Sequence, residues 1–282
     1  DAIRWYFYVV NPPGESKNFD EAEVLKIYRK FHLLYYNSFV FYRTYAKGGA
    51  SKQVKQSKNA LDKWILLRLN QTGKLVGENM DRYDVREAAL VLESFVDDLS
   101  KWYIRRSRRR LQKPDTKLEH LEASATLERV LVSLSKLSAP FIPFFSEAIF
   151  GAVKKYSGLK LESSVHLADW DKFGPVSPKD LEFITAMDHA RNVSSMALAE
   201  RASSALKVRQ PLADLYLGEK AYGLLSKYKE LVSIIQDEVN VKNLSLKKEL
   251  GDKVELNKEI TPELREEGMV RELVRGVSEL RQ

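Results

Sequence analysis

The sequence predicts a mainly α protein, in which an antiparallel helical bundle is followed by a small α+β domain. Between residues 19 and 156, long segments repeat apolar residues at steps of three and four, and short polar loops join them. After residue 211, short segments alternate apolar and polar residues instead, which is typical of strands. The 282 residues are 44% hydrophobic and 30% charged, a globular composition for about two domains.

The bundle begins with an apolar segment, residues 1–10, which ends at the turn signal NPPG at residues 11–14. A helix is predicted over residues 19–46, because its apolar stripe runs from Val24 through the aromatic residues that follow. Further aromatic residues make this helix apolar on more than one side, which indicates burial between neighbours. The polar loop that follows, residues 47–59, is expected to be mobile, with its lysines solvated; these are Lys52, Lys55 and Lys58.

Four more helices complete the predicted bundle. The second runs over residues 61–80, where two glycines weaken its second half. The third begins at Asp84, which forms a capping-box pair with Glu87, and ends before Pro114. The fourth and fifth cover residues 117–137 and 143–156.

The α+β domain follows a linker rich in Gly and Pro. Its first helix is predicted over residues 181–206 and its last from Pro262, with Thr261 as the N-cap. Another helix is predicted between the strands, over residues 219–235. The strand-like segments are 212–218, 239–250 and 253–260.

The residue totals exclude several kinds of protein. Cysteine is absent, which excludes disulfides and thiolate metal sites and agrees with a reducing compartment. The four histidines are scattered, so the sequence indicates no metal site. No segment resembles a membrane span or a signal peptide. The net charge of +7 favours a polyanionic partner only where the cations are concentrated.

They are concentrated at the end of the third helix. Residues 101–113 carry five arginines, two lysines and no acidic residue. At about 100° per residue, Trp102 and Tyr103 lie on either side of the buried stripe centred on Leu99, so Trp102 is expected in the core. Arg106 and Arg110 continue that stripe, and burying either of them without a partner would cost several kcal/mol. The arginines that point away from the stripe are Arg105, Arg108 and Arg109.

This cluster predicts a nucleic-acid interface, because many adjacent cations need a counter-anion and a phosphate backbone supplies one. The alternative is structural: cations near a helix C-terminus are favoured by the helix dipole, and arginine stems cover apolar surface. A second contact is expected in the segment ALKVRQPLADL, whose alternative interpretation is a solvated strand edge. The expected RNA-contacting residues are Arg105, Arg106, Arg108, Arg109, Arg110, Lys113, Lys207, Arg209 and Gln210.

Several strings resemble the C-terminal part of the isoleucyl-tRNA synthetases, a class I aminoacyl-tRNA synthetase family. These strings, spread over most of the chain, are DAIRWYFYVVNPPGE, YDVREAA, LSKWYIRRSRRR, APFIPF, SVHLADW, LKVRQPL and IQDEVNVKNL. The resemblance implies that residues 1–18 end a connection from a catalytic domain and that 19–157 form the anticodon-binding helical bundle. It further implies a linker over 158–180 and a C-terminal α+β domain over 181–282, truncated at its end.

The resemblance also implies a function and its limits. The parent enzyme would charge tRNA with isoleucine in the cytoplasm, using ATP and Mg, and the partner of this region would be the tRNA(Ile) anticodon stem-loop. No H-I-G-H-like or K-M-S-K-S-like string is present, so we expect a fragment that lacks the catalytic and editing domains, holds no cofactor and has no activity alone. Other proteins of a synthetase assembly are possible partners, and a membrane is not.

Three alternatives remain open from the sequence. The same region of a valyl- or leucyl-tRNA synthetase would share the opening segment and the bundle. An adapter module for other proteins would need an exposed apolar patch on the C-terminal domain. An independent enzyme has little support, because the adjacent carboxylates Asp97-Asp98 and Glu266-Glu267 face different sides of a helix, and loop packing explains His166 beside Ser163 and Ser164 better than catalysis does.

Overall fold

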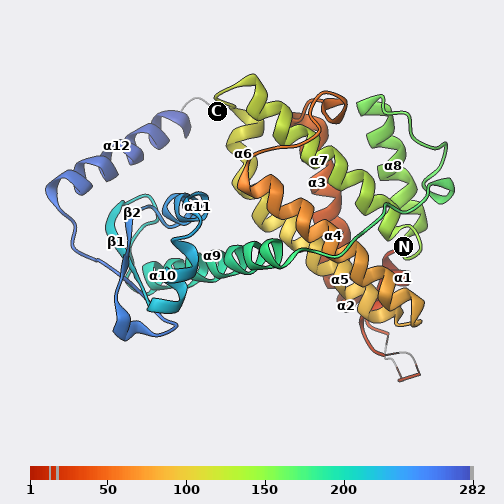
Figure 1. Cartoon of the computed structure of the whole chain (residues 1–282), viewed down its shortest axis with the longest axis horizontal. Coiled ribbons are helices and arrows are strands. Elements are labelled where there is room, and N and C mark those ends of the chain that lie inside the picture. The colour runs from red at the N-terminus through yellow and green to blue at the C-terminus, as the bar shows by residue number, and fades with distance from the viewer. Residues whose placement is uncertain (13, 17–18, 280–282) are drawn as a thin grey trace. The chain divides into compact units, whose positions relative to one another are not determined.

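The computed structural model describes the whole chain except residues 13, 17–18 and 280–282. It forms two compact units, Asp1–Ser177 and Pro178–Gln282. The first unit is helical, and the second combines helices with a small sheet (Figure 1). The predicted fold class, a helical bundle followed by a small α+β domain, is confirmed. Among the described residues, no helix has the length and apolarity needed to cross a membrane.

The first unit contains eight α-helices within its described residues. They are α1 (Ala2–Val9), α2 (Glu21–Tyr28), α3 (Leu34–Tyr45), α4 (Ala60–Asp81), α5 (Val85–Asp97), α6 (Arg105–Gln112), α7 (Lys117–Ser138) and α8 (Pro143–Ser157). A π-helical turn at Arg29–Leu33 joins α2 to α3, and another at Asp98–Ile104 joins α5 to α6. The helices predicted over residues 19–46 and 84–113 are therefore each continuous through a wider turn, which the sequence did not indicate.

The helix ends follow the local chemistry that the sequence showed. The Asp84 carboxylate accepts a hydrogen bond from the Glu87 amide at 3.2 Å, so the predicted cap of α5 is confirmed. Pro143 occupies the first turn of α8, where its missing N–H removes no helical bond. The opening apolar segment is a helix, α1, and its Trp5 ring stacks on Phe31 at 3.8 Å between centroids.

Gly73 lies in the middle of α4 without breaking it. A Cβ at this position would come within 2.4 Å of the Phe173 ring, so only glycine lets the segment after α8 pack this closely. Asn70, one turn earlier, donates to the Gly174 carbonyl at 2.9 Å and accepts from the Gly174 amide at 3.1 Å. The helix tolerates its glycine because of this tertiary contact.

His32 is a buried ionisable residue in the aromatic core of the first unit. Its side chain is 2% exposed and is surrounded by the rings of Trp5, Tyr28, Phe31 and Phe145. Within the described residues, neither ring nitrogen has a hydrogen-bond partner. Burial lowers the pKa of His32 from 6.5 to about 4.

We expect the stability of the first unit to fall as the solution is acidified below pH 6.5. Above that pH His32 is neutral in both the folded and the unfolded state, whereas between pH 6.5 and 4 only the unfolded state takes up the proton. The loss between pH 7 and pH 5 should be about 2 kcal/mol. Urea unfolding of the wild type and of His32→Phe isolates this contribution from the carboxylates; parallel pH profiles would contradict it.

The second unit places a three-stranded sheet beside its helices. Its helices are α9 (Pro178–Ser203), α10 (Glu219–Leu225), α11 (Lys229–Val239) and α12 (Pro262–Glu279), and its strands are β1 (Leu212–Leu217), β2 (Val241–Leu246) and β3 (Val254–Leu256). The strand order is β2-β1-β3, with β1 parallel to β2 and antiparallel to β3.

The prediction of a single helix over residues 219–235 is wrong, because two helices, α10 and α11, occupy this region. The chain turns between α10 and α11, and there the Tyr228 ring contacts Phe183 of α9 at 5.4 Å between centroids. The two helices form the crossover that parallel pairing of β1 and β2 requires. The predicted N-cap of α12 is present, since Thr261 Oγ1 accepts from the Leu264 amide at 3.4 Å.

Candidate nucleic-acid interface

The rotational register predicted for the basic helix is confirmed. Trp102 is 7% exposed and Tyr103 is fully buried, so both belong to the core. Arg106 is half-buried and Arg110 is 6% exposed, whereas the sequence led us to expect both to contact RNA. The cations that face solvent from α6 and the residue after it are Arg105, Arg108, Arg109 and Lys113, and we call these four the α6 basic surface.

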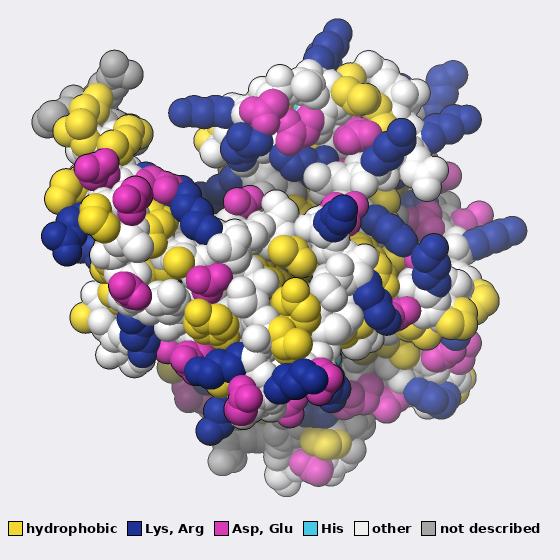
Figure 2. Space-filling view, turned by 60° about the vertical axis from the view of Figure 1, so that its left-hand side comes forward, with side chains coloured by type: hydrophobic (Ala, Val, Ile, Leu, Met, Phe, Trp, Pro, Cys, Tyr) yellow, Lys and Arg dark blue, Asp and Glu magenta, His cyan; other side chains and the backbone are white. Residues whose placement is uncertain are grey.

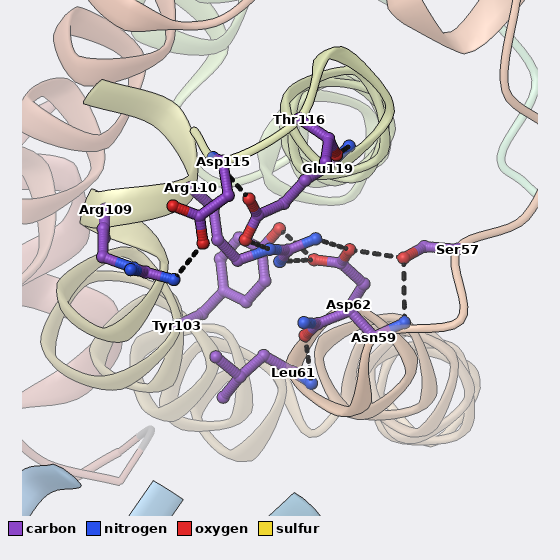
Figure 3. Close-up of polar contacts among 10 residues, drawn as sticks. All are labelled: Ser57, Asn59, Leu61, Asp62, Tyr103, Arg109, Arg110, Asp115, Thr116 and Glu119. Carbon is purple, nitrogen blue, oxygen red and sulfur yellow. Dashed lines mark hydrogen bonds and ion pairs between the residues drawn. The ribbon is translucent and has the colours of Figure 1, made fainter. Parts of the chain in front are cut away.

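Arg110 differs from what the sequence led us to expect, because its guanidinium points inward. It donates to both carboxylate oxygens of Asp62, at 2.9 Å from Nη1 and 2.7 Å from Nη2 (Figure 3). Burial alone would lower the pKa of Arg110, but the hydrogen bonds and the charge of Asp62 outweigh burial and raise it. The expectation that Arg110 contacts RNA is corrected: reaching a phosphate would require this buried pair to open.

Asp62 is the residue that organises this end of the bundle. Its side chain is fully buried near the start of α4. Besides Arg110 of α6, it accepts hydrogen bonds from the Tyr103 hydroxyl at 2.7 Å and the Ser57 hydroxyl at 2.6 Å (Figure 3). Burial and the Asp62 charge together raise the pKa of Tyr103. The carboxylate therefore joins the loop before α4, the π-helical turn and α6 at one point.

Arg109 has an acidic neighbour at the surface. Its guanidinium contacts the Asp115 carboxylate, with the two side chains 70% and 61% exposed. The Asp115 amide donates to Glu119 at 3.0 Å, and the Glu119 amide donates to Thr116 at 3.1 Å, so the turn before α7 is itself fixed. An exposed ion pair of this kind contributes about 0–1 kcal/mol, so a phosphate can displace Asp115.

Two other members of the α6 basic surface lack such a neighbour. Within the described residues, neither Arg108 nor Lys113 has a carboxylate partner at salt-bridge distance. On the face that Figure 2 shows, Asp and Glu side chains lie among many of the Lys and Arg side chains. The end of α6 thus presents outward cations above a buried, neutralised arginine.

The second expected contact lies in the other unit. Residues 207–210 form a turn before β1, so their alternative interpretation as a strand edge is wrong. Lys207 and Arg209 lie 3.8 and 3.6 Å from the Glu272 carboxylate. The Gln210 amide group donates to the Leu264 carbonyl at 2.7 Å, so its nitrogen is engaged inside the unit. These contacts give Lys207, Arg209 and Gln210 a structural role that the sequence did not show.

Arg201 of α9 holds this turn and was missed by the sequence analysis. Its fully buried guanidinium donates to the carbonyls of Lys207 at 3.0 Å, Gln210 at 2.9 Å and Asn240 at 2.9 Å. Burial lowers the pKa of Arg201 to about 10. The one sequence signal for this role of Arg201 is its position on the apolar face of a long predicted helix.

Three of the residues considered for an independent enzyme, Asp97, Asp98 and Ser164, have structural partners. Asp98 is buried beside Arg68, whose Nε donates to it at 3.0 Å, and Asp97 pairs with Lys101 one turn on. Ser164 donates to Glu147 at 2.9 Å and accepts from the His166 amide at 3.2 Å, so it caps a turn. Each of these contacts stabilises a helix or a turn of the fold, so none of them requires a catalytic role.

Comparison of the sequence with known proteins gives evidence on the family of this chain that does not depend on the structure. Residues 62–217 match the family model described as the anticodon-binding domain of tRNA ligase. The chain is similar to proteins named isoleucine–tRNA ligase: 34% identical over all of this chain in Dehalococcoides mccartyi, 37% identical over 94% of it in Clostridium acetobutylicum and 33% identical over 86% of it in Thermus thermophilus. It spans 29%, 25% and 24% of the length of these relatives.

Proposed function

We propose a function for this chain from the premise that it belongs to the anticodon-binding domain family of tRNA ligases: it binds the anticodon region of tRNA(Ile) as part of an isoleucine–tRNA ligase. The α6 basic surface is the observation that carries this proposal. Four cations face solvent at the end of one helix, where a folded RNA offers closely spaced phosphates. The buried pair of Arg110 with Asp62 supports them by fixing α6 to α4.

The reaction of the whole enzyme is part of the proposal. The relatives are named isoleucine–tRNA ligases, and we propose that the whole enzyme joins isoleucine to its tRNA at the expense of ATP. We propose that ATP and Mg bind outside these 282 residues and that the enzyme works in the cytoplasm. A polypeptide of these residues should show no ATP–pyrophosphate exchange above a protein-free blank, and measurable exchange would contradict this division of roles.

We expect the chain to prefer tRNA(Ile) over the tRNAs of valine and leucine. The bundle offers one rigid surface, but without the other contacts of a whole enzyme the affinity should be modest, because linked sites strengthen each other through effective concentration. Filter binding or fluorescence anisotropy with the three purified tRNAs at one salt concentration measures the preference. A preference for the valine or leucine tRNA would favour the region of a sister synthetase instead.

The adapter alternative has one observation in its favour. Helix α12 exposes an apolar stripe, with Leu273 69%, Met269 62% and Val274 60% exposed. Such a patch is the feature that a protein-binding role for the second unit requires. If this role is real, Leu273→Glu should abolish recovery of the chain with other synthetases while its affinity for tRNA stays unchanged.

A further inference from the structure

The loop between α3 and α4 is more ordered than its composition suggests. Residues 47–58, which we call the lysine loop, are rich in Lys, Gly, Ser and Gln and were expected to be mobile. In the structure its backbone is bound by two consecutive residues of α7, Glu128 and Arg129. The expectation of a mobile loop is therefore replaced by one of a loop with defined anchors.

Glu128 holds the first half of the loop from inside the bundle. Its side chain is 0% exposed. The carboxylate accepts hydrogen bonds from the Gly49 amide at 2.7 Å, the Ser51 amide at 3.2 Å and the Tyr42 hydroxyl at 2.5 Å, and from the Ser51 hydroxyl. Because a buried carboxylate is stable only when its oxygens are satisfied, folding requires the loop to adopt this conformation.

Arg129 holds the second half of the loop. Its guanidinium donates to the main-chain carbonyls of Val54 and Lys55. Close packing adds a further constraint, since Gly49 has a positive φ of 73° and a Cβ there would lie 2.8 Å from the Ser157 carbonyl oxygen. Both halves of the loop are thus fixed largely through main-chain groups, and these contacts do not use the side chains of Lys47, Lys55 and Lys58.

The lysines of this fixed loop point into solvent. Lys47, Lys55 and Lys58 are exposed, and within the described residues none of the three has a carboxylate at salt-bridge distance. Lys52 is different, because its ammonium donates to the Gly158 carbonyl at 2.6 Å and helps to hold the loop. Holding cations in place before binding lowers the ordering entropy that an anionic ligand must otherwise overcome.

The loop and the α6 basic surface share an anchor. Ser57, next to Lys58, donates to Asp62 at 2.6 Å, and Asp62 binds Arg110 of α6 (Figure 3). The cations at the end of the loop and those of α6 are therefore fixed to the same buried carboxylate within one unit. A ligand that spans both must carry several negative charges along its length, which describes a nucleic-acid backbone.

We propose that the lysine loop is a second, preorganised RNA-phosphate contact that extends the α6 basic surface, with Lys55 and Lys58 as its contacting residues and Glu128 and Arg129 as its positioning residues. This inference rests on the proposed function, since it takes RNA as the ligand. Lysine ammonium groups on a shaped loop suit phosphates better than base edges, so the loop should strengthen binding without selecting the sequence.

The test compares charge-matched variants in the same tRNA titration over a range of salt concentrations. Lys55→Ala/Lys58→Ala should weaken binding and reduce the slope of log affinity against log salt by about 0.7–0.9 for each phosphate that the variant no longer neutralises. The control, Lys26→Ala/Lys74→Ala, removes the same charge from exposed positions of α2 and α4 and should leave the slope unchanged. Equal slopes for the two variants would overturn the proposal.

A second variant tests the positioning role. Arg129→Met keeps every lysine of the loop but removes the donors to its carbonyls, so amide hydrogen exchange in residues 50–58 should accelerate and tRNA affinity should fall with the slope preserved. Unchanged affinity despite faster exchange would overturn this role. An alanine variant of the α6 basic surface, run alongside, separates the failures: if it loses affinity and the loop variant does not, only the loop proposal fails, and if neither does, the proposed function fails.

Discussion

Asp62→Ala is expected to destabilise the first unit by about 3–5 kcal/mol, the usual consequence of removing one partner of a buried ion pair. Arg110, with its side chain 7% exposed, would lose both of its carboxylate bonds, and the hydroxyls of Tyr103 and Ser57 would lose their acceptor. For a unit of this size the melting temperature should fall by roughly 10 °C. All four tryptophans lie in the first unit, so tryptophan fluorescence reports its unfolding selectively.

A compensating variant distinguishes the ion pair from simple packing. Asp62→Leu/Arg110→Met replaces both charged side chains by apolar ones. Replacing both partners of a buried ion pair in this way often leaves the free energy of unfolding unchanged. We expect it to recover most of the stability that Asp62→Ala loses. If the double variant unfolds as early as the single one, the pair does not stabilise this end of the bundle in the way that its geometry indicates.

Arg201→Ala is expected to destabilise the second unit by about 3–5 kcal/mol. The change removes three charge-assisted hydrogen bonds to main-chain carbonyls and leaves a cavity where a fully buried side chain stood. Arg201→Met should reduce the stability of the second unit less than Arg201→Ala does, because methionine fills most of the vacated volume and the change removes a buried charge.

The second unit contains no tryptophan, so the unfolding of the two units can be followed separately. Far-UV circular dichroism should show an earlier unfolding transition in Arg201→Ala, while the tryptophan transition of the first unit stays where it is in the wild type. Coincident wild-type and variant dichroism curves would show that the turn at residues 207–210 holds without the guanidinium.

The sequence predicted those features that depend on residues close together in the chain. The limits of α4, α7 and α8, the cap at Asp84 and the rotational register of the basic helix all follow from local spacing and local hydrogen bonding. The register placed Arg110 in line with the apolar stripe, but its burial in an ion pair was not predicted. Its partner Asp62 lies 48 positions earlier in the chain, and no local pattern joins the two residues.

The features that the sequence missed depend on long-range contacts. Gly73 weakens a helix by propensity, yet α4 continues through it because the Phe173 ring packs against the bare backbone. The lysine loop looks flexible by composition, but Glu128 and Arg129, more than seventy positions later, bind its backbone. Such contacts are decided by how the helices pack, and composition carries no information on that.

The charge pattern of the sequence and the structure both indicate the end of α6 as the surface that binds RNA. Arg110 belongs to the buried frame, whereas Arg105, Arg108, Arg109 and Lys113 face solvent at the end of α6. Because RNA phosphates release bound counterions when cations neutralise them, the salt dependence of affinity measures such contacts more directly than affinity at one condition does.

The most direct test of this surface is a salt titration of tRNA(Ile) binding by the variant in which Arg105, Arg108 and Arg109 are all replaced by alanine. We expect weaker binding and a slope reduced by about 0.7–0.9 for each phosphate left without its cation, with the tryptophan unfolding transition unchanged. Wild-type affinity and wild-type slope in a variant that unfolds normally would show that tRNA does not bind at the end of α6.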